Sequence, residues 1–193
     1  IRHVPVETFR IQNRGGKGLK GVATKDEDSP QSIVTCFSKD RLLIFTNLGR
    51  VYGLKAWETP QGSRHSRGTH IRNLLENLQE GEDIVSILPI SKDIVDEVTE
   101  KCLKVKLEEG EKRPSSGYFL LFATKLGLIK KTDLHEYVRI NRNGKYALRF
   151  KLENDSLVNV QQSVDTDDVV MISTTGYASR FKCEAIRTSG RVS

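Results

Sequence analysis

Arginine and lysine recur beside glycine in four short polar segments of the chain, and this combination suits the binding of phosphate groups. The segments are residues 12–18, 63–68, 139–145 and 187–191. A guanidinium or ammonium group supplies positive charge, and Arg can hold one phosphate through two parallel hydrogen bonds. Glycine has no Cβ, so backbone N–H groups can approach the same oxygens. One such segment is typical of a solvated turn, but the repetition predicts a surface that binds a phosphate backbone.

The elements that position these segments have the pattern of β-hairpins. Residues 41–52, 118–130 and 169–179 each contain an apolar run, a hydroxyl residue, a glycine three positions later and a second β-prone run. A glycine supplies the positive φ that ends a tight loop between two strands. The glycines are Gly49, Gly127 and Gly176. A basic segment follows each hairpin, so the sequence predicts repeated copies of one unit.

The spacing of these glycines predicts an insertion between the first and second hairpins. It is 49 residues from Gly127 to Gly176 but 78 residues from Gly49 to Gly127. Removing residues 91–116 restores a period of about 50, which is in the range of propeller-type repeats. Residues 92–113 are dense in charges of both signs and carry about −1, which leaves about +7 on the rest of a chain of net charge +6. We expect a solvated excursion here.

Two local structures remain open for the inserted stretch. Ile94, Val98 and Cys102 follow one another at intervals of four, as on one face of a short helix. Residues 103–107 instead alternate apolar and polar side chains, as in a strand.

The predicted fold is all-β. Units of three or four short antiparallel strands cannot bury a sheet face alone, so neighbouring units must stack. A propeller-like array of antiparallel four-stranded blades meets this requirement, and two stacked sandwiches or small barrels are the alternative. We expect residues 1–193 to form one domain of this kind, with the charged insertion at about 91–116.

The residue types also exclude several kinds of site. No apolar run approaches the ~20 residues of a membrane-spanning helix. The three cysteines are too widely separated for a disulfide framework or a zinc motif, and the four histidines have no ligand spacing. Because the sequence contains no nucleophile motif, P-loop or acidic metal cluster, we expect neither a catalytic centre nor a cofactor in this domain. Trp57 follows a strand, and we expect it to pack rather than to stack on bases.

One of the basic segments resembles a motif of a known family. Residues 12–18 read Gln-Asn-Arg-Gly-Gly-Lys-Gly and are similar to the seven-residue box, Q-R-R-G-G-K-G, of the C-terminal domain of DNA gyrase A proteins. Asn13 departs from the box, which has an Arg at this position. Other parts of the chain that resemble the family are residues 5–9, 41–52, 64–68, 71–74 and 128–132. The resemblance spans nearly the whole chain except the insertion.

The resemblance implies a β-pinwheel, a propeller-like disc whose blades exchange strands, of which this chain forms a fragment or an incomplete disc. The family's disc wraps double-stranded DNA around a basic rim, independently of base sequence, and presents it to the cleavage core for negative supercoiling. The implied partners are the gyrase A breakage-reunion domain and the gyrase B subunit, and the parent topoisomerase uses ATP and Mg²⁺ elsewhere. The implied location is the bacterial cytoplasm at the nucleoid, or an organelle. A topoisomerase IV-type domain, which lacks the box, and a propeller-type protein-interaction module are the alternatives.

The residues expected to contact DNA are the matching members of the box and the cations of the basic segments and hairpins. They are Gln12, Arg14, Gly15, Gly16, Lys17, Gly18, Lys20, Arg50, Arg64, Arg67, Arg72, Lys130, Lys131, Arg139, Arg142, Lys145, Arg187 and Arg191. All of these contacts would be made to the DNA backbone, which carries no direct sequence information.

Overall fold

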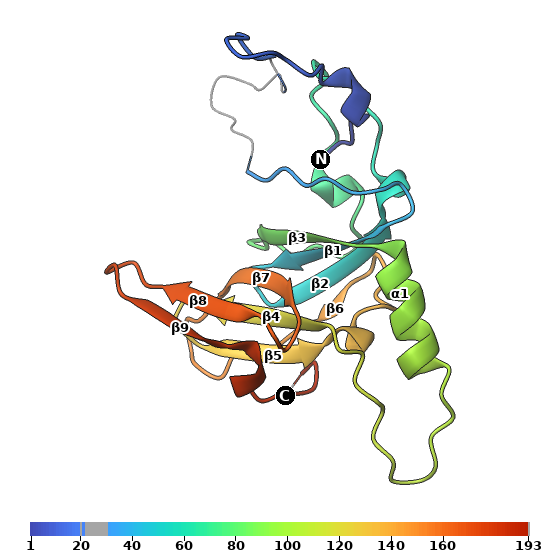
Figure 1. Ribbon diagram of the computed structural model, residues 1–193, viewed down its shortest axis with the longest axis vertical. Coiled ribbons are helices and arrows are strands. Elements are labelled where there is room, and N and C mark those ends of the chain that lie inside the picture. Colours follow the sequence, from blue (N-terminus) through green and yellow to red (C-terminus); the bar gives the residue numbers. More distant parts are fainter. Residues whose placement is uncertain (20, 22–30, 193) are drawn as a thin grey trace.

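Three antiparallel β-hairpins follow one another along the chain in the computed structural model, which describes residues 1–19, 21 and 31–192 (Figure 1). The hairpins are β1 (Arg41–Thr46) with β2 (Arg50–Lys55), β4 (Phe119–Thr124) with β5 (Ile129–Asp133), and β8 (Asp168–Ile172) with β9 (Ala178–Lys182). The sequence prediction of a hairpin at each of the three glycines is therefore confirmed.

The three hairpin turns are closed by the same two hydrogen bonds. In the first turn, the Gly49 N–H donates to the Thr46 carbonyl (3.0 Å), and the Thr46 hydroxyl accepts the Arg50 N–H (3.3 Å). The same pair of bonds recurs at Thr124 and Ser173, whose hydroxyl oxygens accept at 3.2 and 3.1 Å. The glycines have φ values of +74°, +82° and +86°. The recurring hydroxyl residue therefore satisfies the backbone of a turn that only glycine enters easily.

A short 3₁₀ turn follows the second strand of every hairpin, which the sequence pattern did not predict. These turns are η2 (Ala56–Glu58), η5 (Leu134–Glu136) and η6 (Cys183–Ala185). The first residue of each is buried, and its N–H donates to the carbonyl just before the first strand, at 2.9 Å in all three cases. This bond ties the exit of each hairpin to its entrance and sets the direction of the basic segment that follows.

Strands from different repeats share one sheet. β3 (Ile84–Ile90) and β7 (Leu157–Ser163) return to pair with β1 and β4 of their own hairpins. In contrast, β6 (Lys145–Tyr146) leaves the second repeat and pairs with β2 of the first. The sheets have the orders β3-β1-β2-β6, β5-β4-β7 and β8-β9. Among the described residues, only the first sheet therefore has the four strands expected of a blade, and its fourth strand comes from the next repeat.

The main core lies between the first two sheets. Phe45 of β1, Phe122 of β4 and Tyr137 are fully buried, and the two phenylalanine rings meet edge to face with centroids 5.6 Å apart. Burial of one such side chain contributes roughly 1.5–3 kcal/mol, so this cluster is a principal link between the first and second repeats. The first and second repeats therefore share one hydrophobic core.

The inserted stretch begins as a helix that belongs to the core. α1 (Lys92–Val98) continues into a π-helical turn, η4 (Thr99–Leu103), and the Ser91 hydroxyl caps α1 by accepting the Ile94 N–H (3.3 Å). Val98 and Cys102 are fully buried in the main core. The helical alternative is thus correct, the strand alternative is wrong, and the expectation of a solvated excursion holds only for the loop beyond η4, which extends away from the sheets (Figure 1).

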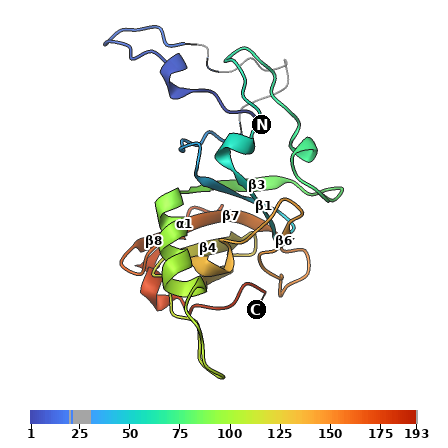
Figure 2. The ribbon, with the colours of Figure 1, turned by 90° about the vertical axis from the view of Figure 1, so that its right-hand side faces the viewer.

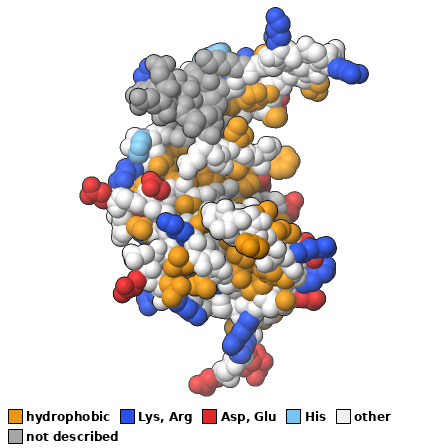
Figure 3. Space-filling view, turned by 90° about the vertical axis from the view of Figure 1, so that its left-hand side faces the viewer, with side chains coloured by type: hydrophobic (Ala, Val, Ile, Leu, Met, Phe, Trp, Pro, Cys, Tyr) orange, Lys and Arg blue, Asp and Glu red, His pale blue; other side chains and the backbone are white. Residues whose placement is uncertain are grey.

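The third hairpin is much more exposed than the other two. It projects to one side in Figure 1, and Figure 3 views the molecule from that side, with hydrophobic groups visible among the charged ones. Val170, Ile172 and Tyr177 are 56%, 74% and 80% exposed. In the part of the chain that the structure describes, no helix has the length and apolar character needed to cross a bilayer.

Candidate nucleic-acid interface

The box-like segment forms a turn that is closed by its own first residue. The Gly18 N–H donates to Oε1 of Gln12 (2.9 Å), and the Gly16 N–H donates to the Asn13 carbonyl (3.0 Å). Gln12 therefore folds the segment through its side chain, whereas Asn13 contributes only a backbone group to these bonds. Because the side chain at position 13 takes no part in these two bonds, the departure from the family's Arg leaves them intact.

The cations of the box point into solvent. Arg14 and Lys17 are exposed, as are the glycines Gly15, Gly16 and Gly18. The segment stands on an arm at the N-terminal end of the molecule, apart from the sheets (Figure 1). Lys20, which was also predicted to bind DNA, lies outside the described residues.

The basic segment after the first hairpin is shaped by a cation that the sequence reasoning missed. Arg2 donates through Nη1 to the Ser66 hydroxyl (3.0 Å) and through Nη2 to the Arg64 carbonyl (2.8 Å). Arg64 is half-buried, and Arg67 is exposed. No local pattern could have indicated this role, because Arg2 lies more than 60 residues away in the sequence.

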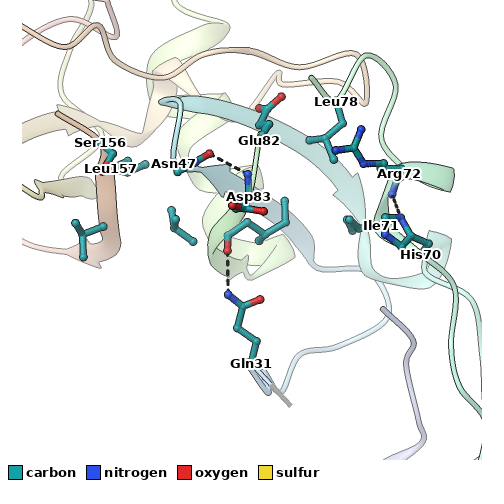
Figure 4. A pocket seen from close by; sticks show the side chains of 13 residues that line it. Gln31, Asn47, His70, Ile71, Arg72, Leu78, Glu82, Asp83, Ser156 and Leu157 are labelled. Carbon is teal, nitrogen blue, oxygen red and sulfur yellow. Dashed lines mark hydrogen bonds between the residues drawn. The ribbon is translucent and has the colours of Figure 1, made fainter. Parts of the chain in front are cut away.

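Arg72 lies farther along, on the 3₁₀ turn η3 (Ile71–Asn73), beside an open cavity of about 610 Å³ (Figure 4). Its guanidinium donates to the Gln79 carbonyl (3.3 Å), and its N–H donates to Nδ1 of His70 (3.2 Å). Across the cavity, the Asp83 N–H donates to Oδ1 of Asn47 (2.9 Å). The cavity is lined by the Asp83 carboxylate, whose negative charge would repel a phosphate. Arg72 is the one predicted cation in its described lining, so the predicted cations do not converge here.

The basic segment of the second repeat crosses onto the first repeat. Arg139, Arg142 and Lys145 are exposed, and Nη2 of Arg142 lies 2.8 Å from Oε1 of Glu58. Gly144 has a φ of +73°, and a Cβ at this position would lie 2.5 Å from the Tyr52 ring. The close approach of this segment to β2 therefore requires a glycine.

The basic segment of the third repeat contacts the second in the same way. Arg191 donates through Nη1 to the Tyr146 carbonyl (2.9 Å), and its own carbonyl accepts from Nζ of Lys130 (2.7 Å). Burial lowers the pKa of Lys130 to about 8. Arg187 is exposed. Arg191 and Lys130 therefore link the second and third repeats. Arg187 is the cation of this segment that is most accessible to a phosphate.

Two of the predicted DNA contacts are wrong, because they lie in the interior. Nη1 of Arg50 lies 3.2 Å from the buried Glu82 carboxylate. Lys131 is 3% exposed, forms an ion pair with Asp165, and lies 4.1 Å from the centre of the Phe119 ring. Arg50 is bound by the segment that leads into β3 of its own repeat, whereas Lys131 is bound by residues that follow β7, at Asp165 and the Cys183 carbonyl. Their charges are neutralised inside the protein and cannot reach a phosphate.

Trp57 also departs from expectation. Its side chain is 58% exposed, so the expected packing role is wrong. It is the second residue of η2, the position taken by His135 in η5.

The three basic segments that follow the hairpins lie along one side of the molecule. Figure 2 shows the segment after η2, the segment around β6 and the C-terminal segment in succession along one side of the molecule, with the box on its arm at the N-terminal end. Six predicted cations are exposed and, within the described ranges, have neither a carboxylate partner nor a side-chain hydrogen bond: Arg14, Lys17, Arg67, Arg139, Lys145 and Arg187. Arg72 is also exposed and has no carboxylate partner among the described residues, but its guanidinium donates to the Gln79 carbonyl. No cluster of three or more His, Cys, Asp or Glu side chains suited to a metal ion occurs in residues 1–19, 21 and 31–192.

Comparison with known proteins shows the family to which the chain is similar. The family described as DNA gyrase C-terminal domain, beta-propeller, matches residues 1–35, 40–91, 118–163 and 167–193. The unmatched residues 92–117 contain α1, η4 and the loop that follows. The DNA gyrase A protein of Staphylococcus epidermidis is 37% identical over 191 residues, which are 99% of this chain and 19% of that protein. The corresponding protein of Staphylococcus aureus strain MRSA252 gives the same identity and coverage.

Solved structures share the fold. The C-terminal domain of DNA topoisomerase IV matches with a TM-score of 0.67 and 23% identity over 90% of this chain and 47% of that one. A DNA gyrase A C-terminal domain matches with a TM-score of 0.62 and 22% identity over 97% of this chain and 52% of that one. The chain thus spans about a fifth of its curated relatives and about half of these solved domains. By sequence and by fold, the chain belongs to the family of DNA gyrase A C-terminal domains.

Proposed function

We propose that this chain binds duplex DNA along the side that carries its basic segments and bends the DNA around that side, as a DNA-wrapping part of a DNA gyrase A protein. The observation that carries the proposal is the repeated placement of the three later segments, at residues 63–68, 139–145 and 187–191. Each of these three follows a hairpin and a 3₁₀ turn at the same point of the repeat, and they succeed one another along one side of the molecule (Figure 2). A row of cations related in this way follows the backbone of a long polyanion better than it fits a compact ligand.

The available chemistry supports contacts to phosphates rather than to bases. Of the six exposed cations without a carboxylate partner or a side-chain hydrogen bond, five stand on loops and turns and Lys145 on the two-residue strand β6, and none lies on a helix or a long ribbon that could enter the major groove. Each phosphate neutralised in B-DNA contributes about 0.9 to the dependence of log K on log salt. Six contacts would give a slope of about −5, with little preference among base sequences.

Bending is favourable if the contacts outweigh the elastic cost. A smooth bend of about 40–90° costs of order 1–6 kcal/mol, and several phosphate contacts can offset this amount. Successive repeats that are rotated relative to one another would present their basic segments along an arc. DNA that follows the arc is bent in one sense, which is the geometric requirement for a change in supercoiling.

The wider role follows from the relatives. We propose that the chain has no catalytic centre or cofactor of its own, and that its parent protein works with a breakage-reunion domain and a gyrase B subunit in ATP-dependent negative supercoiling of bacterial cytoplasmic DNA. The box-like turn favours this role over that of a topoisomerase IV-type domain, since it keeps Arg14 and Lys17 exposed. A protein-interaction module would instead use these segments as ordinary turns.

A topology assay tests the proposal. The chain is added to a relaxed plasmid, a nicking-closing enzyme removes unconstrained supercoils, and the linking number is measured at increasing salt. A shift in linking number that disappears with salt is expected. Absence of binding to duplex DNA at low salt would exclude the proposal, and binding without a linking-number shift would exclude wrapping.

A further inference from the structure

An ion pair joins the second basic segment to the first repeat. Nη2 of Arg142 lies 2.8 Å from Oε1 of Glu58, which ends the 3₁₀ turn η2. The Glu58 side chain is 20% exposed and that of Arg142 is 46% exposed, so the contact is partly shielded from solvent. Arg142 was predicted from the sequence to contact DNA, but its guanidinium already has a carboxylate partner.

A second contact, independent of Arg142, also holds the Glu58 carboxylate in place. Its second oxygen, Oε2, accepts the Lys55 N–H at 2.7 Å, which closes the turn η2. Partial burial alone would raise the pKa of Glu58, but the hydrogen bonds from the Lys55 N–H and from Arg142 outweigh it and lower this pKa. The carboxylate is therefore charged at neutral pH and fixed in one orientation.

The backbone around Arg142 is bound to the first repeat as well. Three consecutive carbonyls, those of Ile140, Asn141 and Arg142, accept hydrogen bonds from the first repeat. The donors are the Arg41 guanidinium, the Gly53 N–H (3.2 Å) and the Glu76 N–H (3.2 Å). The Arg142–Glu58 pair adds a side-chain ion pair to these links. The two cations that flank this bound stretch, Arg139 and Lys145, are exposed and have no carboxylate partner among the described residues.

We propose that Arg142 and Glu58 are positioning residues that lock the second basic segment onto the preceding repeat, so that Arg139 and Lys145 are presented to DNA in a fixed place. The inference rests on the proposed function and deepens it. In this arrangement, Glu58 aids DNA wrapping although it is an acid, and Arg142 aids it without contacting a phosphate.

Neutral substitutions separate positioning from charge. Removing an acid near bound DNA would ordinarily strengthen binding, because it reduces repulsion of the phosphates. If Glu58 positions the segment, Glu58→Gln reduces the linking-number shift instead. Glu76→Gln is the matched control, because Glu76 lies in the same region but contributes its backbone N–H rather than its carboxylate to the link. This control is expected to leave the shift unchanged or to increase it.

The salt dependence of binding tests whether Arg142 itself contacts a phosphate. Arg139→Gln removes a phosphate contact and should lower the slope of log K against log salt by about 0.9. Arg142→Gln and Glu58→Gln should weaken wrapping and lower this slope alike, because both release Arg139 and Lys145, whereas a direct phosphate contact by Arg142 would lower the slope in Arg142→Gln alone. Arg142→Lys, which restores the charge, should recover part of the wrapping. Thermal melting by circular dichroism checks that every variant is folded.

Hydrogen exchange gives a readout that needs no DNA. The Gly53 and Glu76 amides donate to the locked segment, so Glu58→Gln should speed their exchange severalfold relative to Glu76→Gln. Unchanged exchange in Glu58→Gln, or a lower salt slope in Arg142→Gln that Glu58→Gln does not share, would overturn the positioning role. If the unaltered chain fails to bind DNA, the proposed function fails, and the exchange rates still decide whether the pair locks the segment.

Discussion

Nη1 of Arg50 lies 3.2 Å from Oε2 of Glu82, whose side chain is completely buried. The Glu82 carboxylate also accepts hydrogen bonds from the Thr46 hydroxyl (2.7 Å), the Tyr52 hydroxyl and the Gln79 N–H (2.8 Å). A buried carboxylate with this many donors ties the first hairpin to the segment that leads into β3. Arg50 therefore belongs to the internal structure of the repeat and not to its DNA-binding side.

Substitution of Glu82 should destabilise the chain strongly. Glu82→Ala leaves the Arg50 charge buried without its partner, and loss of one member of a buried pair costs about 3–5 kcal/mol. Urea denaturation followed by circular dichroism measures the change in the free energy of unfolding. A loss below about 1 kcal/mol, the range of exposed ion pairs, would show that the pair is solvated.

Two glycines should respond differently to the same substitution. Gly127 and Gly144 both have positive φ, but a Cβ on Gly127 has nothing within 4 Å, whereas one on Gly144 would lie 2.5 Å from the Tyr52 ring. Gly127→Ala should cost about 1–2 kcal/mol from backbone conformation alone. Gly144→Ala should cost clearly more, because the segment must also move away from β2. Equal losses in urea unfolding would contradict the close approach at Gly144.

Stability should fall in acid because of Asp133. Burial alone would raise its pKa, but hydrogen bonds from His135, Ser116 and Ser115 hold the pKa of Asp133 well below its usual range. A carboxylate with a lowered pKa in the folded state stabilises the fold above the pKa of the unfolded chain, about 4, and loses this contribution as pH falls towards the folded-state value.

Asp133→Asn isolates this contribution. At neutral pH it should lower the free energy of unfolding by about 1–3 kcal/mol, because the hydrogen-bond donors around the site lose a charged acceptor. The difference in stability between the unaltered chain and this variant should shrink as the pH falls below about 4. A constant difference between neutral and acidic pH, in denaturation at matched ionic strength, would rule out the ionised carboxylate as its source.

Restoring the family's cation in the box should strengthen DNA binding. Asn13 contributes only its carbonyl to the turn, so Asn13→Arg should leave the fold unchanged. One added phosphate contact would raise the magnitude of the salt slope by about 0.9. Titration of duplex DNA at several salt concentrations measures this slope, and Asn13→Gln serves as the uncharged control. If both variants give the same slope, the box does not contact phosphates at this position.

The hairpins could be predicted from the sequence because their signal is local. Gly49 needs a positive φ, and Thr46, three positions earlier, supplies the hydroxyl that satisfies the turn. Both requirements fall within a few residues, so a repeated spacing reveals them. The helical alternative for the insertion came from the same kind of local signal, the spacing of Val98 and Cys102, but the sequence did not decide between it and a strand.

Features that depend on contacts between residues distant in sequence could not be predicted in this way. Arg50 and Lys131 read as surface cations, since their carboxylate partners, Glu82 and Asp165, lie more than 30 residues away. Arg2 shapes the segment around Ser66 across a still longer separation. Charge and spacing therefore indicate which segments are basic, while only the packing of repeats decides which cations remain free.

The donation of β6 to the preceding sheet makes the repeats thermodynamically interdependent. A unit whose outer edge is completed by its successor cannot reach full stability until that successor has folded. Excision of residues 118–163 would therefore damage two units at once, because it would also remove the strand that pairs with Arg50 and Val51. Changes in repeat number should be tolerated best at the ends of the array, and internal deletions should cause cooperative loss of structure on both sides of the cut.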